Sequence, residues 1–242
     1  MNNLSIKKLG IFDIDGTIFR SALFLELVYG LVDDKVFPNK ILKDVNKEYT
    51  AWANRRGNYM DYVHASWDAF IREIKGKEEK TVNEVIDKFL LKHKDRVYRY
   101  TRDIIKDLKK KKYTLIAISG SPTHVVSKFA EYMGFEYFLG SDFETKNGKF
   151  TGRILTDGSQ NKGDTLIRFI EKKGLRIDLE NSIGVGDAGI DISFLNLVGK
   201  PIAFNPSSVL AAYAKKNNWK IIVERKDVVY EIKDFKFVSL KS

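Results

Sequence analysis

The chain has 242 residues, of which 43% are hydrophobic, 12% aromatic and 31% charged, and this length fits one enlarged domain or a domain that carries an insertion. The composition excludes a disordered chain and a collagen-like repeat, and the lack of cysteine excludes disulfides, thiol nucleophiles and thiolate metal sites. The 42 Lys and Arg residues against 32 Asp and Glu residues give a net charge of +10, which favours anionic partners.

The apolar segments are too short for a signal peptide or a membrane span. The first apolar run, residues 9–12, is interrupted by Asp13. The later stretch 22–32 contains Glu26 and Gly30 and falls well short of the roughly 20 residues that cross a bilayer. We therefore expect a soluble, cytoplasmic protein with no membrane partner.

The first part of the chain predicts one strand followed by helices. Residues 9–14 form the strand, and helical periodicity extends from about residue 20 to residue 111. Two helices are predicted over residues 37–53 and 59–75. A third has apolar residues at helical spacing, namely Val82, Val85, Ile86, Phe89 and Leu90. We expect residues 20–98 to form an all-helical cap domain that acts as a lid.

The second part of the chain alternates between strands and helices. Strands are predicted at 113–119, 137–139, 182–185, 201–204 and 220–223, and helices at 123–133, 162–173, 190–197 and 207–216. Residues 143–153 read as a hairpin, because Asn147 and Gly148 suit a type I′ turn. The alternation predicts an α/β core, residues 1–19 and 99–242, whose parallel sheet has helices on both faces and binds ligands at the carboxyl ends of its strands.

Paired carboxylates follow the first predicted strand. Asp13 and Asp15 lie two residues apart, so they share one face of an extended chain and repel each other unless a cation or a shared proton relieves them. Mg²⁺ would provide this relief, because it binds one or two carboxylates together with phosphate oxygens. Gly16 permits a sharp exit from the strand, and Thr17 can turn its hydroxyl back onto the loop.

Three further polar groups follow strands or begin helices. Ser119 and Gly120 combine a hydroxyl, a flexible backbone and a nearby helix start, which is typical of an anion site. Lys162 begins a helix and offers a mobile positive charge for a phosphate. A glycine-lined loop then presents Asp187 and Asp191, four residues apart.

In this order, the motifs resemble the haloacid dehalogenase (HAD) superfamily of phosphotransferases, and within it the phosphoserine-phosphatase-like branch with a helical cap after the first motif. The resemblance covers residues 8–19 and 112–224. It implies a Rossmann-like HAD core and the activity of a phosphoric monoester hydrolase, a phosphatase that acts on a small phosphorylated metabolite.

The resemblance also implies a role for each motif residue. Asp13 would be the nucleophile that becomes an aspartyl-phosphate, and Asp15 the general acid and base. The non-bridging phosphate oxygens would be bound by Ser119, Gly120 and Lys162. The cofactor Mg²⁺ would be held at a metal site formed by Asp13, Asp15 through its backbone carbonyl, and Asp187, with Asp191 in or beside it.

Several positions depart from the phosphoserine phosphatase pattern, so the resemblance leaves the substrate open. Ala22 stands where those enzymes carry the Glu that meets the substrate amine, and Ser121 and Pro122 replace Gly-Phe after the second motif. Ala188 and Ile190 stand where the last motif has Gly and Asn.

Other functions compete with phosphomonoester hydrolysis. Phosphoryl transfer to another acceptor and dephosphorylation of a nucleic-acid end stay open as alternatives. Nucleic acid is nevertheless disfavoured as a partner, because the aromatic residues do not interleave with the basic ones and the basic run 109–112 suits the last turn of a helix. The large insertion after the first strand disfavours a non-catalytic, receiver-like phosphate-sensing module. Asp15 disfavours a dehalogenase, because it is the extra acid that phosphoryl chemistry needs.

Overall fold

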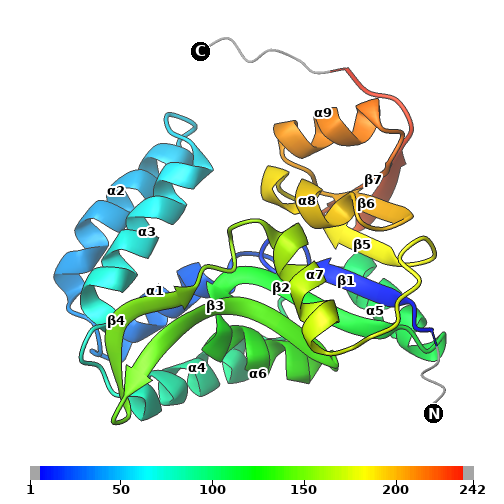
Figure 1. The fold of residues 1–242 in the computed structure, drawn as a ribbon. Helices are drawn as coiled ribbons and strands as arrows, with labels where there is room; N and C mark the ends of the chain where they lie inside the picture. The colour runs from blue at the N-terminus through cyan, green and yellow to red at the C-terminus, as the bar shows by residue number, and fades with distance from the viewer. Residues whose placement is uncertain (1–5, 237–242) are drawn as a thin grey trace.

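The computed structural model describes residues 6–236 and contains an eight-stranded sheet with helices on both faces (Figure 1). The strands are β1 Leu9–Asp13, β2 Thr114–Pro122, β3 Tyr137–Lys146, β4 Lys149–Thr156, β5 Ile183–Gly186, β6 Lys200–Phe204, β7 Lys220–Arg225 and β8 Val228–Ile232. The helices are α1 Leu23–Asp33, α2 Leu42–Ala53, α3 Tyr59–Ile74, α4 Glu79–His93, α5 Arg99–Lys110, α6 Thr123–Met133, α7 Lys162–Lys172, α8 Ile192–Leu195 and α9 Ser208–Lys216. Short 3₁₀ turns span Asn39–Ile41 and Gly189–Asp191.

The centre of the sheet is parallel, which confirms the predicted α/β core. The strand order is β4-β3-β2-β1-β5-β6-β7-β8, and β1 pairs in parallel with both β2 and β5. The carboxyl ends of these three strands therefore meet at one edge of the sheet. The outermost pairs, β3 with β4 and β7 with β8, are antiparallel.

Alternating side chains of the central strands bury two separate cores. On one face, Phe12 and Ala117 belong to a buried cluster with Phe129 of α6. On the other face, Ile11 and Ile118 belong to a cluster with residues of α7, α8 and α9. Figure 1 shows the same two layers, with α7–α9 on one side of the sheet and α4–α6 on the other. This arrangement confirms the prediction of helices on both faces.

The helical block between β1 and β2 has an inner and an outer pair of helices. In the inner pair, α1 and α4 lie against each other, and α4 contacts α6 of the core through a hydrogen bond between Glu79 and His124 (3.0 Å). The predicted apolar stripe of α4 is buried, as expected: Val82, Val85, Ile86, Phe89 and Leu90. In the outer pair, α2 and α3 run side by side and project away from the sheet (Figure 1).

Most predicted element boundaries agree with the structure to within a few residues, and the differences have local causes. The predicted strand 137–139 and the hairpin 143–153 are one continuous unit, because β3 extends to Lys146 and turns at Asn147 (φ 53°) and Gly148 (φ 73°). The predicted helix 190–197 is a 3₁₀ turn followed by the short α8. The strand β8, which follows a tight turn at Lys226 (φ 54°), was not predicted.

Between residues 6 and 236, none of the helices has both the length and the apolar character that crossing a bilayer requires.

Candidate active site

The seven residues singled out from the sequence come together at the carboxyl edge of the parallel strands. Asp13 ends β1, Ser119 and Gly120 lie near the end of β2, and Lys162 is the first residue of α7. Asp187 directly follows β5, and Asp191 ends the 3₁₀ turn after it. Asp15 lies in the loop after β1, and one hydrogen bond connects it to Ser119.

Lys162 bridges two buried carboxylates. Its ammonium nitrogen lies 2.6 Å from Asp13 Oδ1 and 2.6 Å from Asp191 Oδ1, and all three side chains are at most 4% exposed. The second carboxylate oxygen of Asp13, Oδ2, is buried and has no hydrogen-bond partner among the described residues. A buried carboxylate oxygen without a hydrogen-bond partner destabilises the folded protein unless a ligand or a cation binds to it.

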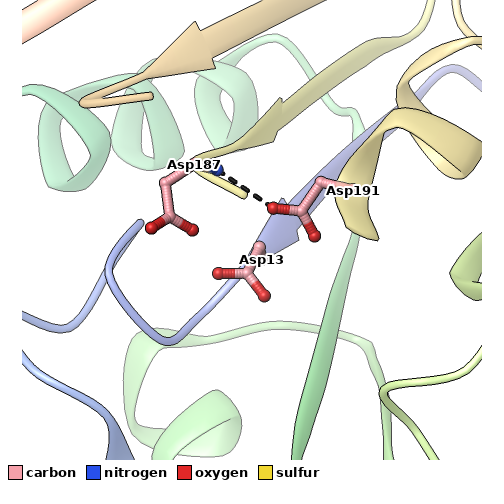
Figure 2. Close-up of side chains that lie close together, drawn as sticks. All are labelled: Asp13, Asp187 and Asp191. Carbon is pink, nitrogen blue, oxygen red and sulfur yellow. Dashed lines mark hydrogen bonds between the residues drawn. The ribbon is translucent and has the colours of Figure 1, made fainter. Parts of the chain in front are cut away.

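Three carboxylates form a group that could hold a metal ion. Asp13, Asp187 and Asp191 each offer an oxygen within 4.8 Å of the others (Figure 2). Asp191 also accepts hydrogen bonds through Oδ2 from the backbone N–H groups of Asp187 (3.0 Å) and Ala188 (2.9 Å), and these bonds fix the loop that presents Asp187. Lys162 contacts two of these carboxylates, and when all three are ionised the group carries two negative charges in excess, which suits a hard divalent cation with oxygen ligands.

The pKa values in this group are perturbed by burial. Desolvation raises the pKa of Asp13 from its ordinary value of 3.8 to about 8, although Lys162 opposes this rise. Desolvation and the neighbouring carboxylates raise the pKa of Asp187 in the same direction. Burial also opposes the charge of Lys162, but Asp13 and Asp191 outweigh burial and raise the pKa of this ammonium. Lys162 is therefore a permanent cation of the site.

Asp15 is held in one orientation by three donors. Its Oδ2 accepts hydrogen bonds from the hydroxyls of Ser119 (2.5 Å) and Ser121 (2.8 Å), and its Oδ1 accepts one from the backbone N–H of Leu23 (2.6 Å) at the start of α1. Desolvation raises the pKa of Asp15, and these hydrogen bonds oppose the rise. The Asp15 side chain therefore lies outside the three-carboxylate group and in a different environment from Asp13.

The loop after β1 approaches the loop after β5 closely. Gly16 adopts φ 86°, and a Cβ atom at this position would lie 2.4 Å from Asp187 Oδ2, so both the conformation and the space require glycine. The Thr17 hydroxyl donates to Asp187 Oδ1 (3.2 Å). Our expectation that Thr17 bonds back to its own loop was wrong, because the neighbouring loop supplies a carboxylate acceptor within reach.

The Ser119-Gly120 segment is packed against a second loop. The Gly120 carbonyl accepts a hydrogen bond from the Ser141 hydroxyl (2.7 Å), which in turn accepts one from the N–H of Gly158 (2.9 Å). A Cβ atom at Gly158 would lie 2.4 Å from the carbonyl oxygen of Ser119, so only glycine permits this approach. Gly158 was not predicted, because nothing local marks its contact with Ser119, 39 residues away in the chain.

Two tyrosines near the carboxylates were also missed. Tyr59 begins α3 and is 39% exposed, and desolvation followed by the negative charges of Asp15 and Asp187 raises the pKa of its hydroxyl. Tyr98 precedes α5 and lies beneath the guanidinium of Arg20 (5.6 Å to the ring centre); desolvation raises its pKa, and Asp187 adds to the rise. Tyr59 lies in the helical block and Tyr98 in the segment that connects this block to α5, and neither segment contains a recognisable sequence motif.

The arrangement has counterparts among curated proteins and solved structures. Phosphoserine phosphatases of Archaeoglobus fulgidus and Methanocaldococcus jannaschii are 31% identical to this chain over 112 and 130 residues, which are 45% and 52% of the chain and 32% and 57% of those proteins. The chain thus spans less than two thirds of their length. A histidinol-phosphatase of Neisseria meningitidis is 23% identical over 90% of the chain and 99% of its own length.

Solved structures share the fold. A protein of unknown function from Bordetella pertussis superposes with a TM-score of 0.71 at 16% identity, over 90% of this chain and 98% of its own. A phospho-aspartyl intermediate analogue of phosphoserine phosphatase superposes with a TM-score of 0.59 at 24% identity, over 92% of this chain and 96% of its own. The model of the haloacid dehalogenase-like hydrolase family matches residues 11–196, which include every residue of the site, and the chain therefore belongs to this family.

Proposed function

We propose that this protein is a Mg²⁺-dependent phosphatase that hydrolyses a small phosphomonoester through an aspartyl-phosphate on Asp13, with Asp15 as general acid and base. The observation that carries the proposal is the contrast between the two carboxylates. Asp13 keeps one oxygen without a hydrogen-bond partner, whereas both oxygens of Asp15 are held by hydroxyl and amide donors. Two carboxylates in such different environments suit two different chemical roles.

The first half of the reaction transfers the phosphoryl group to the enzyme. An Asp13 oxygen attacks phosphorus, and the bond between phosphorus and the ester oxygen breaks. Asp15, whose pKa is raised by desolvation, gives its proton to the departing alkoxide. The products of this half are the free alcohol and the aspartyl-phosphate.

The second half releases phosphate. Asp15, now ionised, takes a proton from a water molecule, and the resulting hydroxide attacks phosphorus. The bond between phosphorus and the Asp13 oxygen breaks, so that inorganic phosphate leaves and the Asp13 carboxylate is restored. The Ser121 hydroxyl and the N–H of Leu23 hold Asp15 in place for both proton transfers, and the Ser119 hydroxyl, which donates to Asp15 in the free protein, turns to the bound phosphate.

The residues present fit a bound magnesium ion. We assign Asp13 and Asp187 as its carboxylate ligands, with the backbone carbonyl of Asp15 as a further ligand. Asp191 belongs to the same group and fixes the Asp187 loop through two backbone hydrogen bonds. When bound, Mg²⁺ neutralises negative charge that would otherwise keep an anionic nucleophile away from an anionic phosphate.

Positive and polar groups of the chain provide the phosphate site. Lys162 is a buried cation next to Asp13, and the hydroxyl of Ser119 and the backbone of Gly120 lie at the end of the neighbouring strand. We assign these three residues to the non-bridging oxygens, where hydrogen-bond donors and a positive charge stabilise the transition state.

A small phosphorylated metabolite fits the proposal best as a substrate. Relatives of this chain are named phosphoserine phosphatase and histidinol-phosphatase, and both names denote small phosphate esters. Ala22 lies at the start of α1, is 7% exposed and carries no charge that could meet a substrate amine. Phosphoserine is therefore one member of the panel to test rather than the assumed substrate.

The test is phosphate release from a panel of phosphomonoesters with Mg²⁺ and with EDTA. We expect release that depends on Mg²⁺, and Asp13→Asn should abolish it while the circular dichroism spectrum stays unchanged. Asp15→Asn should slow both halves of the reaction, and the matched control Asp107→Asn, an exposed aspartate on α5, should retain full activity. An active Asp13→Asn protein, or release that EDTA leaves unchanged, would refute the mechanism.

A further inference from the structure

The strand β8 is an open edge of the sheet. It pairs with β7 on one side, and no other strand described between residues 6 and 236 pairs with its second side. Three consecutive apolar residues of β8 are exposed: Val228 (43%), Val229 (38%) and Tyr230 (48%). An apolar edge strand with unpaired backbone groups is a template for pairing with another chain.

The opposite edge of the sheet is protected. There, Phe150 of β4 donates its N–H to the carbonyl of Lys77 (2.9 Å) and accepts from the N–H of Gly76 (2.7 Å), so the segment between α3 and α4 covers this strand. Glu79 adds a third hydrogen bond, from its N–H to the carbonyl of Gly148 (2.8 Å). The fold thus covers one edge of the sheet with its own backbone and leaves β8 open.

The features that usually guard an open edge are weak at β8. The strand contains no proline, and its one charged residue, Glu231, is paired with Lys220 of β7 (2.9 Å). Natural sheets commonly prevent edge pairing with proline, bulges or unpaired charges along the strand. A single glutamate leaves the other four residues of the strand without a charge that would repel a second strand.

We propose that β8 is a self-association surface, at which β8 of a second copy of this chain pairs antiparallel across a two-fold axis. Such an interface is isologous: if one residue contacts a second residue on the partner, that second residue contacts the first on the other side of the axis. A two-fold pairing is favourable only if the residues that the axis places opposite each other carry complementary charges, and β8 with its flanking residues meets this requirement in one register.

The backbone pattern restricts the pairing. Val228 lies opposite Arg225 next to the turn, and in an antiparallel pair every second residue turns its N–H and C=O groups toward the neighbouring strand. By this alternation, Val228, Tyr230 and Ile232 direct these groups to β7, whereas Val229 and Glu231 direct theirs outward. In a two-fold pairing, outward-facing residues of one copy must lie opposite outward-facing residues of the other. Because outward-facing residues are two apart in the chain, the two-fold axis passes through a residue and not between two residues.

Among centres on the three middle residues of β8, charge favours Tyr230. A centre at Tyr230 places Val229 opposite Glu231 and Asp227 opposite Lys233, so that two opposite-charge pairs form by symmetry. A centre at Val229 would place Asp227 opposite Glu231, and a centre at Glu231 would place Glu231 opposite itself. Both of these registers juxtapose like charges, which destabilises a strand pair.

The same register also joins the apolar residues. With the centre at Tyr230, the two Tyr230 rings face each other, and Val228 of each copy lies opposite Ile232 of the other. Aromatic pairs and pairs of β-branched residues are favourable cross-strand neighbours. Val228 and Tyr230, two of the three exposed apolar residues of β8, would therefore gain apolar neighbours from the second copy.

Sedimentation velocity over a range of protein concentrations tests the proposal. We expect a dimer of twice the 27.8 kDa of one chain. Val229→Pro should give a monomer, because it removes an outward N–H without removing a bond to β7, and the matched control Val229→Thr should stay dimeric. A wild-type protein that is monomeric throughout the range would overturn the proposal.

A charge exchange tests the register independently of proline. Asp227→Lys should weaken the dimer roughly tenfold, since two symmetric pairs change from attraction to repulsion, and adding Lys233→Asp in the same chain should restore it. These residues lie outside the candidate active site, so the charge variants should keep their phosphatase activity. A dimer that responds neither to Val229→Pro nor to the charge exchange would place the interface elsewhere and overturn the proposal.

Discussion

Raising the pH should destabilise the metal-free protein, and Asp13 should account for much of the effect. Burial raises the pKa of Asp13 from 3.8 to about 8, so the folded protein keeps a proton that the unfolded chain has already lost above about pH 4. The stabilisation from this proton is fully present below the unfolded pKa and is lost as the pH rises toward the folded pKa. The sensitive window therefore runs from about pH 4 to about pH 8.

The size of the effect follows from the same pKa shift. One group that is protonated only in the folded state changes the free energy of unfolding by about 1.4 kcal/mol per pH unit, so a rise from about pH 5.5 to about pH 8 costs roughly 3 kcal/mol. For a chain of this length, each kcal/mol lowers Tm by about 2–4 °C, which predicts a fall of roughly 6–12 °C. Asp187, whose pKa is also raised, acts in the same direction.

Thermal unfolding by circular dichroism in EDTA measures this effect, and Asp13→Asn supplies the control. The amide has nearly the shape of the carboxyl group and does not titrate, so the difference between wild type and variant isolates Asp13 from the other groups of the protein. We expect a markedly flatter pH dependence for Asp13→Asn. Mg²⁺ should restore much of the wild-type stability at about pH 8, because a bound cation favours the ionised carboxylates. Equal slopes for wild type and Asp13→Asn in EDTA would refute the reasoning.

Three further substitutions test individual contacts of the site. Gly16→Ala should lower kcat at least about tenfold and lower Tm, because the added Cβ would meet Asp187 Oδ2 at 2.4 Å; steady-state kinetics and thermal melts measure both. Lys162→Met should destabilise the metal-free protein by about 3 kcal/mol in chemical denaturation, because two buried carboxylates lose their cation, and should lower kcat by about a hundredfold or more. Tyr59→Phe should raise KM about three- to tenfold with a smaller change in kcat, whereas Tyr49→Phe, in the same aromatic cluster, should leave both unchanged.

The sequence was sufficient to place the core motifs because short-range rules govern them. Asp13 and Asp15 are two residues apart after a buried strand, and Lys162 begins a helix whose N-cap is Asn161. The parallel arrangement of β1, β2 and β5 then brings these positions to one edge of the sheet. Once the strands are identified, the meeting of these residues follows from the topology of an α/β fold.

The contacts that orient Asp15 were not predicted, for two different reasons. Ser121 could have been found, because it shares a strand face with Ser119, as Asp13 shares one with Asp15. Instead, Ser121 was read only as a departure from a family pattern. The N–H of Leu23 could not have been found, because its contact with Asp15 depends on where α1 begins, and α1 lies in a helical block without sequence motifs.

The edge strand β8 was missed for a further reason. Its residues Val228 to Ile232 are mostly exposed, so they do not show the alternation of apolar and polar residues that marks a half-buried strand. Pairing with β7 fixes this segment as a strand, and such long-range information is absent from a local pattern.

The hydrogen bonds of α1 also limit how the helical block can move. The N–H of Leu23 binds Asp15, and the N–H of Phe24 binds the hydroxyl of Ser121 (3.1 Å), so the first turn of α1 is joined directly to the proposed general acid. A rigid movement of residues 20–98 away from the core would break both bonds and would release Asp15 from one of its three donors. A bend confined to α2 and the first turns of α3 would leave Asp15 in place and would still move Tyr59. If the helical block moves to admit a substrate to Asp13, Asp15 therefore keeps its orientation only when α1 stays in place against the core.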